Sequence, residues 1–458
     1  MSDQRQRGTS RFASLERRLW APVDAASLVF FRLGFGLLMV WDLLHYVLDG
    51  RLERLYAQPL VHFTFYGFDW VKVAPDGILR LIFWLLVGLA AAIAAGLWYR
   101  LAAALFAVGY GYVLLLDAAA YNNHNYLILL LAILLIFVPA HRAGSLDALR
   151  RRDLRSPVVP AWALWLLRFQ VGVPYFFGGV AKLNYDWLVA AQPMRMWLET
   201  DNLGGSLRLA FFDRPWFAAF MSWGGALFDL AVVPLLLWRR TRLAAFLLAS
   251  AFHVANSHLF NIGVFPWLMI CATTLYFAPD WPRRSGLIGR PPGRRARPAK
   301  AIAGRRRRLS LALLGAWVAI QVLMPLRHWL YPGNVDWTDE AHRFSWRMKV
   351  RDKQGEVRFM LVDHRTRKAT LLNGAEAVLT PRQRRMMTQD PEMIRQFAHY
   401  LAARLAERGV EGGEIHALTR ISLNGRPPQA LIDPEVDLAA EPPSLLPRRW
   451  IVPLEPRR

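Results

Sequence analysis

Long apolar runs recur through the first 330 of the 458 residues, and this pattern constrains the fold more than any other feature. Most runs are about 16 to 23 residues long, the length that an α-helix needs to cross a bilayer core of roughly 30 Å. A soluble chain of this length would alternate short apolar stretches with loops. The sequence therefore predicts a mainly α-helical integral membrane protein. We place nine transmembrane spans, at residues 24–46, 81–98, 101–117, 124–139, 159–181, 216–238, 243–256, 260–278 and 309–327.

The basic residues are distributed unequally between the two sides of the predicted membrane region. The chain has 57 Lys and Arg against 34 Asp and Glu, a net charge of +23. With nine spans, 25 basic residues fall on the N-terminal tail and the even-numbered connections, and eight fall on the opposite short loops. By the positive-inside rule, the tail at residues 1–23 and the basic loop at 284–308 are predicted to be cytoplasmic. The region after the ninth span is then predicted to be extracytoplasmic.

Residues 328–458 are predicted to form a small extracytoplasmic α+β domain, following a transmembrane helical domain at residues 24–327. Short alternating runs indicate strands at residues 343–350, 356–363, 369–372 and 415–423, and helical spacing indicates a helix at 381–408. This domain has 21 basic and 17 acidic residues, a difference of only four. The net charge therefore indicates membrane orientation, and nucleic-acid binding is not expected.

Three of the predicted spans carry polar residues at their outer ends, where a polar group is costly unless it is paired or hydrated. These residues are Asn122, Asn123 and His124 at the start of span four, Lys182 at the end of span five, and His253 and Asn256 near the end of span seven. The topology brings the three ends to one membrane depth, so we expect His124, Lys182 and His253 to converge. Helix capping by the asparagines and structural hydrogen bonds from the histidines remain alternatives.

Lys182 is unusual because the chain has 51 arginines and only six lysines. A position that keeps lysine in such a sequence indicates a need for a group that can lose its proton, which arginine cannot do. Burial in a cavity would lower the pKa of a lysine and leave an amine able to act as a general base. An interfacial lysine at a helix end, with its ammonium group in water, is the alternative.

Other polar residues within the spans have structural interpretations. We expect Arg32, Asp42, Arg168 and Asp229 to pair with one another and hold the helices together. No metal site is expected, because Cys271 is the only cysteine and the histidines lack the spacing of zinc ligands.

Four segments of the chain are similar to segments of one known family. They are Asp24 to Asp42, Tyr121-Asn-Asn-His-Asn-Tyr126, Tyr175-Phe-Phe-Gly-Gly-Val-Ala-Lys-Leu-Asn-Tyr-Asp-Trp187 and Phe252 to Phe265. These segments resemble the vitamin K-dependent gamma-glutamyl carboxylases, whose bacterial members are often called horizontally transferred transmembrane proteins, abbreviated HTTM. Shorter similar segments at residues 281–283, 327–346 and 433–437 extend the resemblance over essentially the whole chain.

The resemblance implies a reaction and roles for individual residues. Lys182 matches the lysine that deprotonates reduced vitamin K, whose oxygenation to the epoxide supplies the base that removes a γ-proton from a peptide glutamate. His124 matches a histidine that steers or stabilises the glutamate carbanion before carbon dioxide adds to it. The remaining expected quinone-binding or substrate-binding residues are Asn122, Asn123, His253, Asn256, Phe265 and Met269.

The leading prediction from the sequence is thus a gamma-glutamyl carboxylase-like enzyme that uses reduced vitamin K or menaquinol with oxygen and carbon dioxide, and no metal. Its expected partners are the bilayer, the quinol and a glutamate-containing peptide. One alternative is a quinol epoxidase or oxygenase that does not carboxylate glutamate. Another is a non-enzymatic transporter or membrane scaffold in which Lys182 is a binding or interfacial cation.

Overall fold

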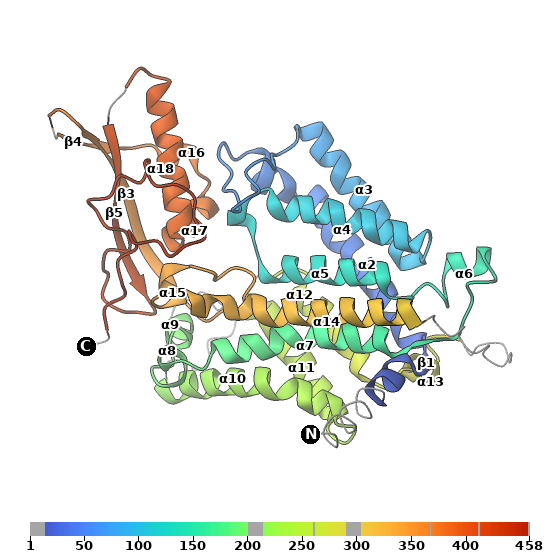
Figure 1. Ribbon diagram of the computed structural model, residues 1–458. Helices are drawn as coiled ribbons and strands as arrows, with labels where there is room; N and C mark the ends of the chain where they lie inside the picture. Colours follow the sequence, from blue (N-terminus) through green and yellow to red (C-terminus); the bar gives the residue numbers. More distant parts are fainter. Residues whose placement is uncertain are drawn as a thin grey trace, which may run out of the picture.

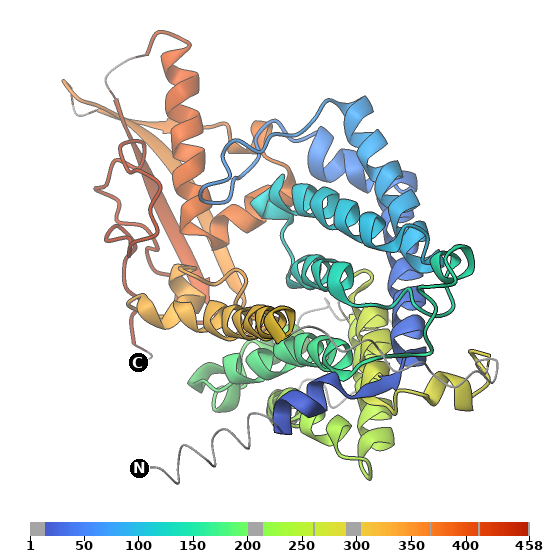
Figure 2. The same cartoon turned by 45° about the vertical axis from the view of Figure 1, so that its right-hand side comes forward.

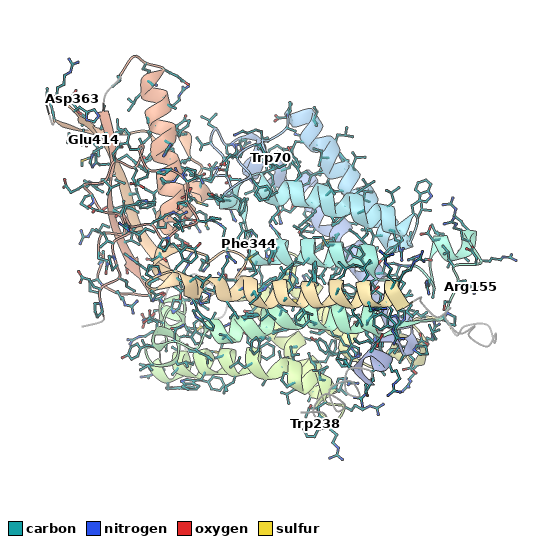
Figure 3. All side chains as sticks on the ribbon, in the orientation of Figure 1. Trp70, Arg155, Trp238, Phe344, Asp363 and Glu414 are labelled. Atoms are coloured by element: carbon teal, nitrogen blue, oxygen red, sulfur yellow. The ribbon has the colours of Figure 1, made fainter. Side chains whose placement is uncertain are left out.

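A computed structural model describes residues 14–199, 214–259, 262–289, 304–366, 368–410 and 413–456. Most of the predicted cytoplasmic tail and residues 290–303 of the basic loop lie outside this part of the chain. The described residues form a bundle of helices with a smaller α+β unit at one end (Figure 1). In Figure 3, Asp363 and Glu414 mark the outer edge of that unit, and Arg155 lies at the opposite end of the bundle.

Each of the nine predicted spans corresponds to one helix. These helices are α2 (Ala26–Leu48), α3 (Asp76–Ala95), α4 (Tyr99–Leu115), α5 (Asn123–Phe137), α7 (Ala161–Ala181), α10 (Pro215–Leu237), α11 (Arg242–Leu259), α12 (Phe265–Thr273) and α14 (Gly304–Leu326). Their connections contain α6 (Leu146–Arg150), α8 (Tyr185–Leu188), α9 (Met194–Glu199), α13 (Trp281–Arg284) and the antiparallel strands β1 (Pro22–Asp24) and β2 (Val158–Pro160).

The chain is a membrane protein, but nine membrane crossings are not confirmed. Among the described residues, four helices are long and apolar enough to cross a bilayer: α2, α3, α10 and the continuous helix Gly304–Leu330. Helices α4 and α5 and the segment Phe265–Tyr276 are apolar but shorter. Helices α7 and α11 carry polar residues that face the protein interior, such as Gln170 and His253, and these lower their hydropathy. Buried polar residues within a helix thus weaken the hydropathy signal on which the span count depends.

Close packing around α2 organises the bundle. The Phe31, Phe35 and Met39 side chains of α2 are completely buried. A Cβ atom on Gly36 would lie 2.6 Å from the Ala94 backbone nitrogen, so only glycine allows α2 and α3 to approach this closely. Dispersion and close contact, which small residues permit, are the main forces that hold helices together in a membrane.

The C-terminal unit is a three-stranded antiparallel sheet in the order β4-β3-β5, covered by helices. The strands are β3 (Lys353–Asp363), β4 (Ala369–Leu372) and β5 (Gly413–Leu423), and the helices are α15 (Val335–Thr338), α16 (Ala375–Val378), α17 (Pro381–Gln389) and α18 (Pro391–Ala406). Buried residues of α18 pack on the sheet, and the Phe397 and Phe359 ring centroids are 5.3 Å apart. Helix α18 lies between the sheet and the bundle in both views (Figures 1 and 2).

Two predictions for this unit were wrong in detail. Residues 343–350 do not form a strand, because Phe344, Trp346 and Lys349 have positive φ angles of 61°, 58° and 51°, which no extended strand allows. The single predicted helix at 381–408 is two helices, because Asp390 ends α17 and caps the start of α18 before Pro391. The predicted strands at 356–363, 369–372 and 415–423 are present as β3, β4 and β5.

Aromatic contacts join the C-terminal unit to the bundle. The Phe344 ring lies 4.8 Å from the Tyr126 ring and 5.1 Å from the Tyr121 ring, and it occupies the junction between the two parts in Figure 3. The Gln383 side chain of α17 donates to Asp117, which is 2.8 Å away and lies just after the end of α4. The residues after α14 are therefore held directly over the end of the bundle where the predicted polar residues lie.

Candidate functional site

A cavity of about 980 Å³ lies where the helix bundle meets the C-terminal unit. Its walls come from the start of α5, the end of α7, one face each of α10 and α11, and the start of α12. The segment from Asp339 to Arg351 and the end of α17 cover it. A concave site of this size is suited to a ligand larger than a few atoms.

All eight residues selected from the sequence line this one cavity. They are Asn122, Asn123, His124, Lys182, His253, Asn256, Phe265 and Met269. They come from four helices and are separated by as many as 147 positions in the chain, so the fold alone brings them together. His258, just beyond this set, instead lies on the exposed side of α11 and contacts the Val254 carbonyl oxygen at 2.9 Å.

Lys182 is buried and paired with a carboxylate. Its Nζ donates to Asp229 Oδ2 at 2.6 Å and to the Gly178 carbonyl oxygen at 3.2 Å, and each side chain of the ion pair is 9% exposed. Nζ also lies 5.4 Å from the centre of the Trp187 ring. The ammonium group therefore does not extend into interfacial water. A buried pair of this kind gives a proton two alternative sites, the amine and the carboxylate.

The glycines before Lys182 make this pair possible. A Cβ atom on Gly179 would lie 2.7 Å from Leu230 Cγ, so α7 and α10 could not approach to their present distance with a larger residue there. Lys182 follows directly at the C-terminus of α7, and Asp229 precedes Leu230 in α10. The Gly-Gly pair in the sequence thus sets the distance between the lysine and its carboxylate.

The prediction that Arg32, Asp42, Arg168 and Asp229 pair with one another was wrong: within the described residues, none of the four forms an ion pair with another. Arg32 donates to the Ala140 and Gly144 carbonyl oxygens, and Arg168 donates to those of Leu275 and Phe277. Helix ends offer unpaired carbonyl groups, which satisfy a guanidinium group without a second buried charge.

His253, which lines the cavity, forms a hydrogen bond through one ring nitrogen and buries the other. Its Nε2 lies 2.6 Å from Tyr175 Oη, while its Nδ1 is buried and has no hydrogen-bond partner among the described residues. An unpaired buried polar atom is costly, so a bound molecule that supplies a partner to Nδ1 would remove that cost. Tyr175 was not selected from the sequence, because a tyrosine in a helix carries no signal of its function.

His124 and His253 face the same aromatic residue. The Phe265 ring centroid is 5.9 Å from the His124 ring and 5.7 Å from the His253 ring. Asn122 occupies the residue before α5, but its side chain does not cap the helix and instead donates to the Ala120 carbonyl oxygen at 3.2 Å. Asn123 accepts from Tyr121 Oη at 3.1 Å. Flat rings and amide groups therefore alternate around this part of the cavity.

Basic and acidic residues that were not selected from the sequence line another side of the cavity, and the acidic ones include Asp339 and Asp390. Arg343, Arg347, Lys349 and Arg351 all line the cavity. Three of these arginines pair with buried carboxylates: Arg343 with Asp390, Arg347 with Asp336 and Arg351 with Asp339. Two of the six lysines of the chain, Lys349 and Lys353, lie in this stretch. The rarity of lysine, which had singled out Lys182, could have identified this segment as well.

Asp339 is the centre of a buried charge network in residues 339–353, here called the basic segment. Its carboxylate binds Arg351 and lies 2.9 Å from Lys353 Nζ, and the Lys353 side chain is fully buried. Burial by itself would raise the pKa of Asp339, but the positive charges of Arg351 and Lys353 outweigh burial and hold that pKa well below its usual value. Burial also lowers the pKa of Lys353.

Among the described residues, no group of three or more His, Cys, Asp or Glu side chains is arranged to hold a metal ion.

A helix bundle with an internal cavity, apolar on one side and charged on the other, defines a membrane protein with an internal small-molecule site. The HTTM domain family matches residues 20–281, and the vitamin K-dependent gamma-carboxylase lumenal domain matches residues 306–457. The chain therefore belongs to the HTTM family, and the two matches together place it in the vitamin K-dependent gamma-carboxylase family, as the sequence resemblance predicted. This family implies a vitamin K-type cofactor. No solved structure matches the chain.

Proposed function

We propose that this protein is a gamma-glutamyl carboxylase-like enzyme that couples oxygenation of a membrane quinol to carboxylation of a peptide glutamate. The observation that carries the proposal is the buried Lys182–Asp229 pair, which lies in a cavity between an apolar wall and a basic wall. We further propose that residues 24–327 form the transmembrane domain with a cytoplasmic N-terminus, and that residues 328–458 form an extracytoplasmic domain.

The apolar wall fits a quinol with a hydrocarbon tail. The cavity continues between α10 and α11, where Phe220, Leu227, Leu235, Leu248 and Ala251 line it. Positions 227 and 235 lie eight residues apart on α10, a distance of about 12 Å along the helix axis, which several isoprenoid carbons could occupy. At the other end, the unpaired His253 Nδ1 could form a hydrogen bond with a quinol oxygen. Either reduced vitamin K or menaquinol has these features.

Lys182 is the proposed general base. Its ammonium group would first release a proton to solvent; the neutral amine would then accept a proton from a quinol hydroxyl group, and Asp229 at 2.6 Å would stabilise the ammonium group that forms again. When bound, the reduced quinone supplies the reaction with oxygen that ends in the epoxide and yields a base strong enough to take a glutamate γ-proton. Trp187 and the apolar residues around Nζ would exclude water from this step.

The basic wall fits the anionic reactants of carboxylation. A peptide glutamate carries one negative charge and its carboxylated product carries two, so cationic side chains near the reacting carbon would stabilise the product more than the substrate. His124 lines the same cavity with its ring 5.9 Å from the Phe265 ring, and from there it could orient the carbanion toward carbon dioxide.

The proposal is tested by incubating the purified full chain in nanodiscs with reduced menaquinone or vitamin K, oxygen, labelled bicarbonate and a glutamate-containing peptide. We expect both quinone epoxide and labelled peptide. Epoxide without labelled peptide would instead identify a quinol oxygenase that does not carboxylate glutamate. Neither product, with several quinols and an intact fold, would contradict an enzymatic function and favour a transporter or scaffold.

Replacing His124 should separate the two half-reactions. His124→Ala is expected to keep most of the epoxide formation and to reduce labelled peptide by about 10²-fold or more, because the residue acts after the quinol chemistry. Both products are measured in the same reaction mixture. Equal loss of both products would show that His124 acts on the quinol, and wild-type rates of both products would show that His124 has no role in the reaction.

Replacing Asp229 should weaken the base without removing it. Asp229→Asn keeps the shape of the side chain but removes the negative charge that stabilises the Lys182 ammonium group, so epoxide formation should fall by about 10-fold to 100-fold. The rate is measured against pH. A variant with the wild-type rate and the wild-type pH profile would contradict a role for this carboxylate.

A further inference from the structure

The first half of strand β3 has an open edge. Strand β5 pairs with β3 over its full length, from Lys353 to Asp363, whereas β4 pairs only with residues 359–362. Strand β4 ends at Leu372, opposite Phe359, and the chain then turns away into α16. No strand of the described residues pairs with residues 353–358 on this side. Figure 1 shows β4 against the end of β3 that is far from the helix bundle.

The backbone groups on this edge can be identified from the register. In an antiparallel sheet, alternate residues direct their N–H and C=O groups to opposite neighbours. The Asp363 N–H donates to the Lys368 carbonyl oxygen, on the β4 side. Every second residue before it faces the same side, so Val357 and Gly355 direct their backbone groups to the open edge, while Lys353, which faces the same side, is buried.

A groove follows the open edge. A cavity of about 860 Å³ is lined by residues 353–357 of β3 on one side and by Ala375, Glu376 and residues of α17 on the other. It shares Trp197, Lys349, Arg351 and Gln389 with the cavity that contains Lys182. A chain lying along the edge of β3 could therefore continue directly into the candidate active site.

The exposed basic residues of the groove lie mainly on α17. Of its five basic lining residues, Arg351 and Lys353 share the buried carboxylate of Asp339, which leaves Lys349, Arg384 and Arg385 beside the acidic residues Asp352, Glu356 and Glu376. Arg385 is exposed and forms no ion pair with another described residue. Arg384 forms an ion pair with the exposed carboxylate of Glu376 at 3.3 Å, a pair that contributes little stability and is easily exchanged for another carboxylate.

We propose that an acidic peptide binds this groove in extended form, as an added strand antiparallel to β3 and in line with β4. Backbone hydrogen bonds to Gly355 and Val357 would hold it irrespective of sequence, and Arg384 and Arg385 would select acidic side chains. This inference rests on the proposed function, because it describes how the glutamate-containing peptide reaches the cavity. It explains why this edge is left uncovered, since an open edge otherwise favours aggregation.

Peptide methylation tests the mode of binding. A fluorescent glutamate-rich peptide is titrated with the full chain in nanodiscs, without quinol, and binding is followed by fluorescence anisotropy. A strand uses only one of its two edges, so N-methylation at alternate residues should change Kd by less than about 3-fold, whereas N-methylation of five consecutive residues should raise it by more than about 10-fold. If the unmethylated peptide, the alternately methylated peptide and the consecutively methylated peptide bind equally well, binding by strand addition is contradicted. Slower hydrogen exchange of residues 353–357 with bound peptide is also expected.

Reversing the charge of Arg385 tests whether this residue belongs to the peptide-binding groove. Arg385→Glu should raise the peptide Kd by about 10-fold at low salt and less at high salt, because the interaction is partly exposed. Arg408→Glu is the matched control, since Arg408 is also exposed but lies at the end of α18, outside the groove. Equal effects of the two variants would overturn the assignment of Arg385 to the binding surface.

The outcomes separate peptide binding in the groove from the proposed enzymatic function. Lys182→Ala should bind the peptide like the wild type, because the binding assay needs no turnover. If the protein forms labelled peptide but binds the methylated peptides equally well, peptide binding in the groove is contradicted and the carboxylase proposal is not. Binding with the predicted methylation pattern, but without either product, would support the groove and contradict the carboxylase proposal.

Discussion

Lys182→Ala is expected to lose both epoxide and labelled peptide, by about 10²-fold to 10⁴-fold, which is the usual contribution of a general base. Both products should fall together, because proton removal from the quinol precedes all later steps in the proposed reaction. The measurement is the initial rate of each product in nanodiscs. An unchanged thermal unfolding curve would establish that the variant is folded.

Two further measurements distinguish a base from a simple cation at this position. Lys182→Arg keeps a positive charge beside Asp229 but cannot give up its proton, so it should remain inactive. A small primary amine added to Lys182→Ala should restore part of the rate. An active Lys182→Arg would contradict the proposed base and would favour a role in holding an anion.

Asp339→Asn is expected to destabilise the C-terminal unit strongly. The substitution leaves Arg351 and Lys353 without the carboxylate that they share, and loss of one partner in a buried charge network costs about 3–5 kcal/mol. In a unit of this size, Tm should fall on the order of 10 °C or more. Glu407→Gln is the matched control, because it breaks the exposed pair with Arg404, which is worth at most about 0.5 kcal/mol.

The pH dependence of this effect has a definite sign. The pKa of Asp339 is lower in the folded than in the unfolded chain, so its carboxylate stabilises the fold fully above the unfolded value of about 4. That contribution decreases as the pH falls through the folded pKa. The difference in Tm between the wild type and Asp339→Asn should therefore be constant above about pH 5 and shrink in more acidic solution. A difference that grows in acid would contradict the ion-pair explanation.

The sequence predicted the helices well because their signal is local. Apolar runs of membrane length located nine helices, and alternation with turn residues located β3, β4 and β5. The number of crossings could not be fixed in this way, since among the described residues Tyr99–Leu115, Asn123–Phe137 and Phe265–Tyr276 are apolar but short, and α7 and α11 carry buried polar residues such as Gln170 and His253. The strand predicted at residues 343–350 failed because its alternating pattern comes from arginines that turn inward to buried carboxylates.

Some residues of the candidate site could be identified from the sequence, and others only from the structure. Lys182 could be selected from the sequence because lysine is rare in this chain, and His124 because it resembles a family histidine. Tyr175 could not, because its role depends on a 2.6 Å contact with His253, which is 78 residues further along. Asp229 was noticed as a charged residue in a span, but its partner was predicted wrongly, since charge alone does not specify which helix lies opposite.

By itself, the sequence determined that this is a helical membrane protein with a C-terminal α+β unit, that it belongs to its family, and that Lys182 is a candidate base. These conclusions follow from periodicity, composition and motifs, which neighbouring residues encode. Only the tertiary structure decided that Lys182 pairs with Asp229, that Asp339 organises the basic segment and that half of β3 remains open. Such features depend on contacts between residues far apart in the chain, and their energies are set by burial, which only the folded arrangement creates.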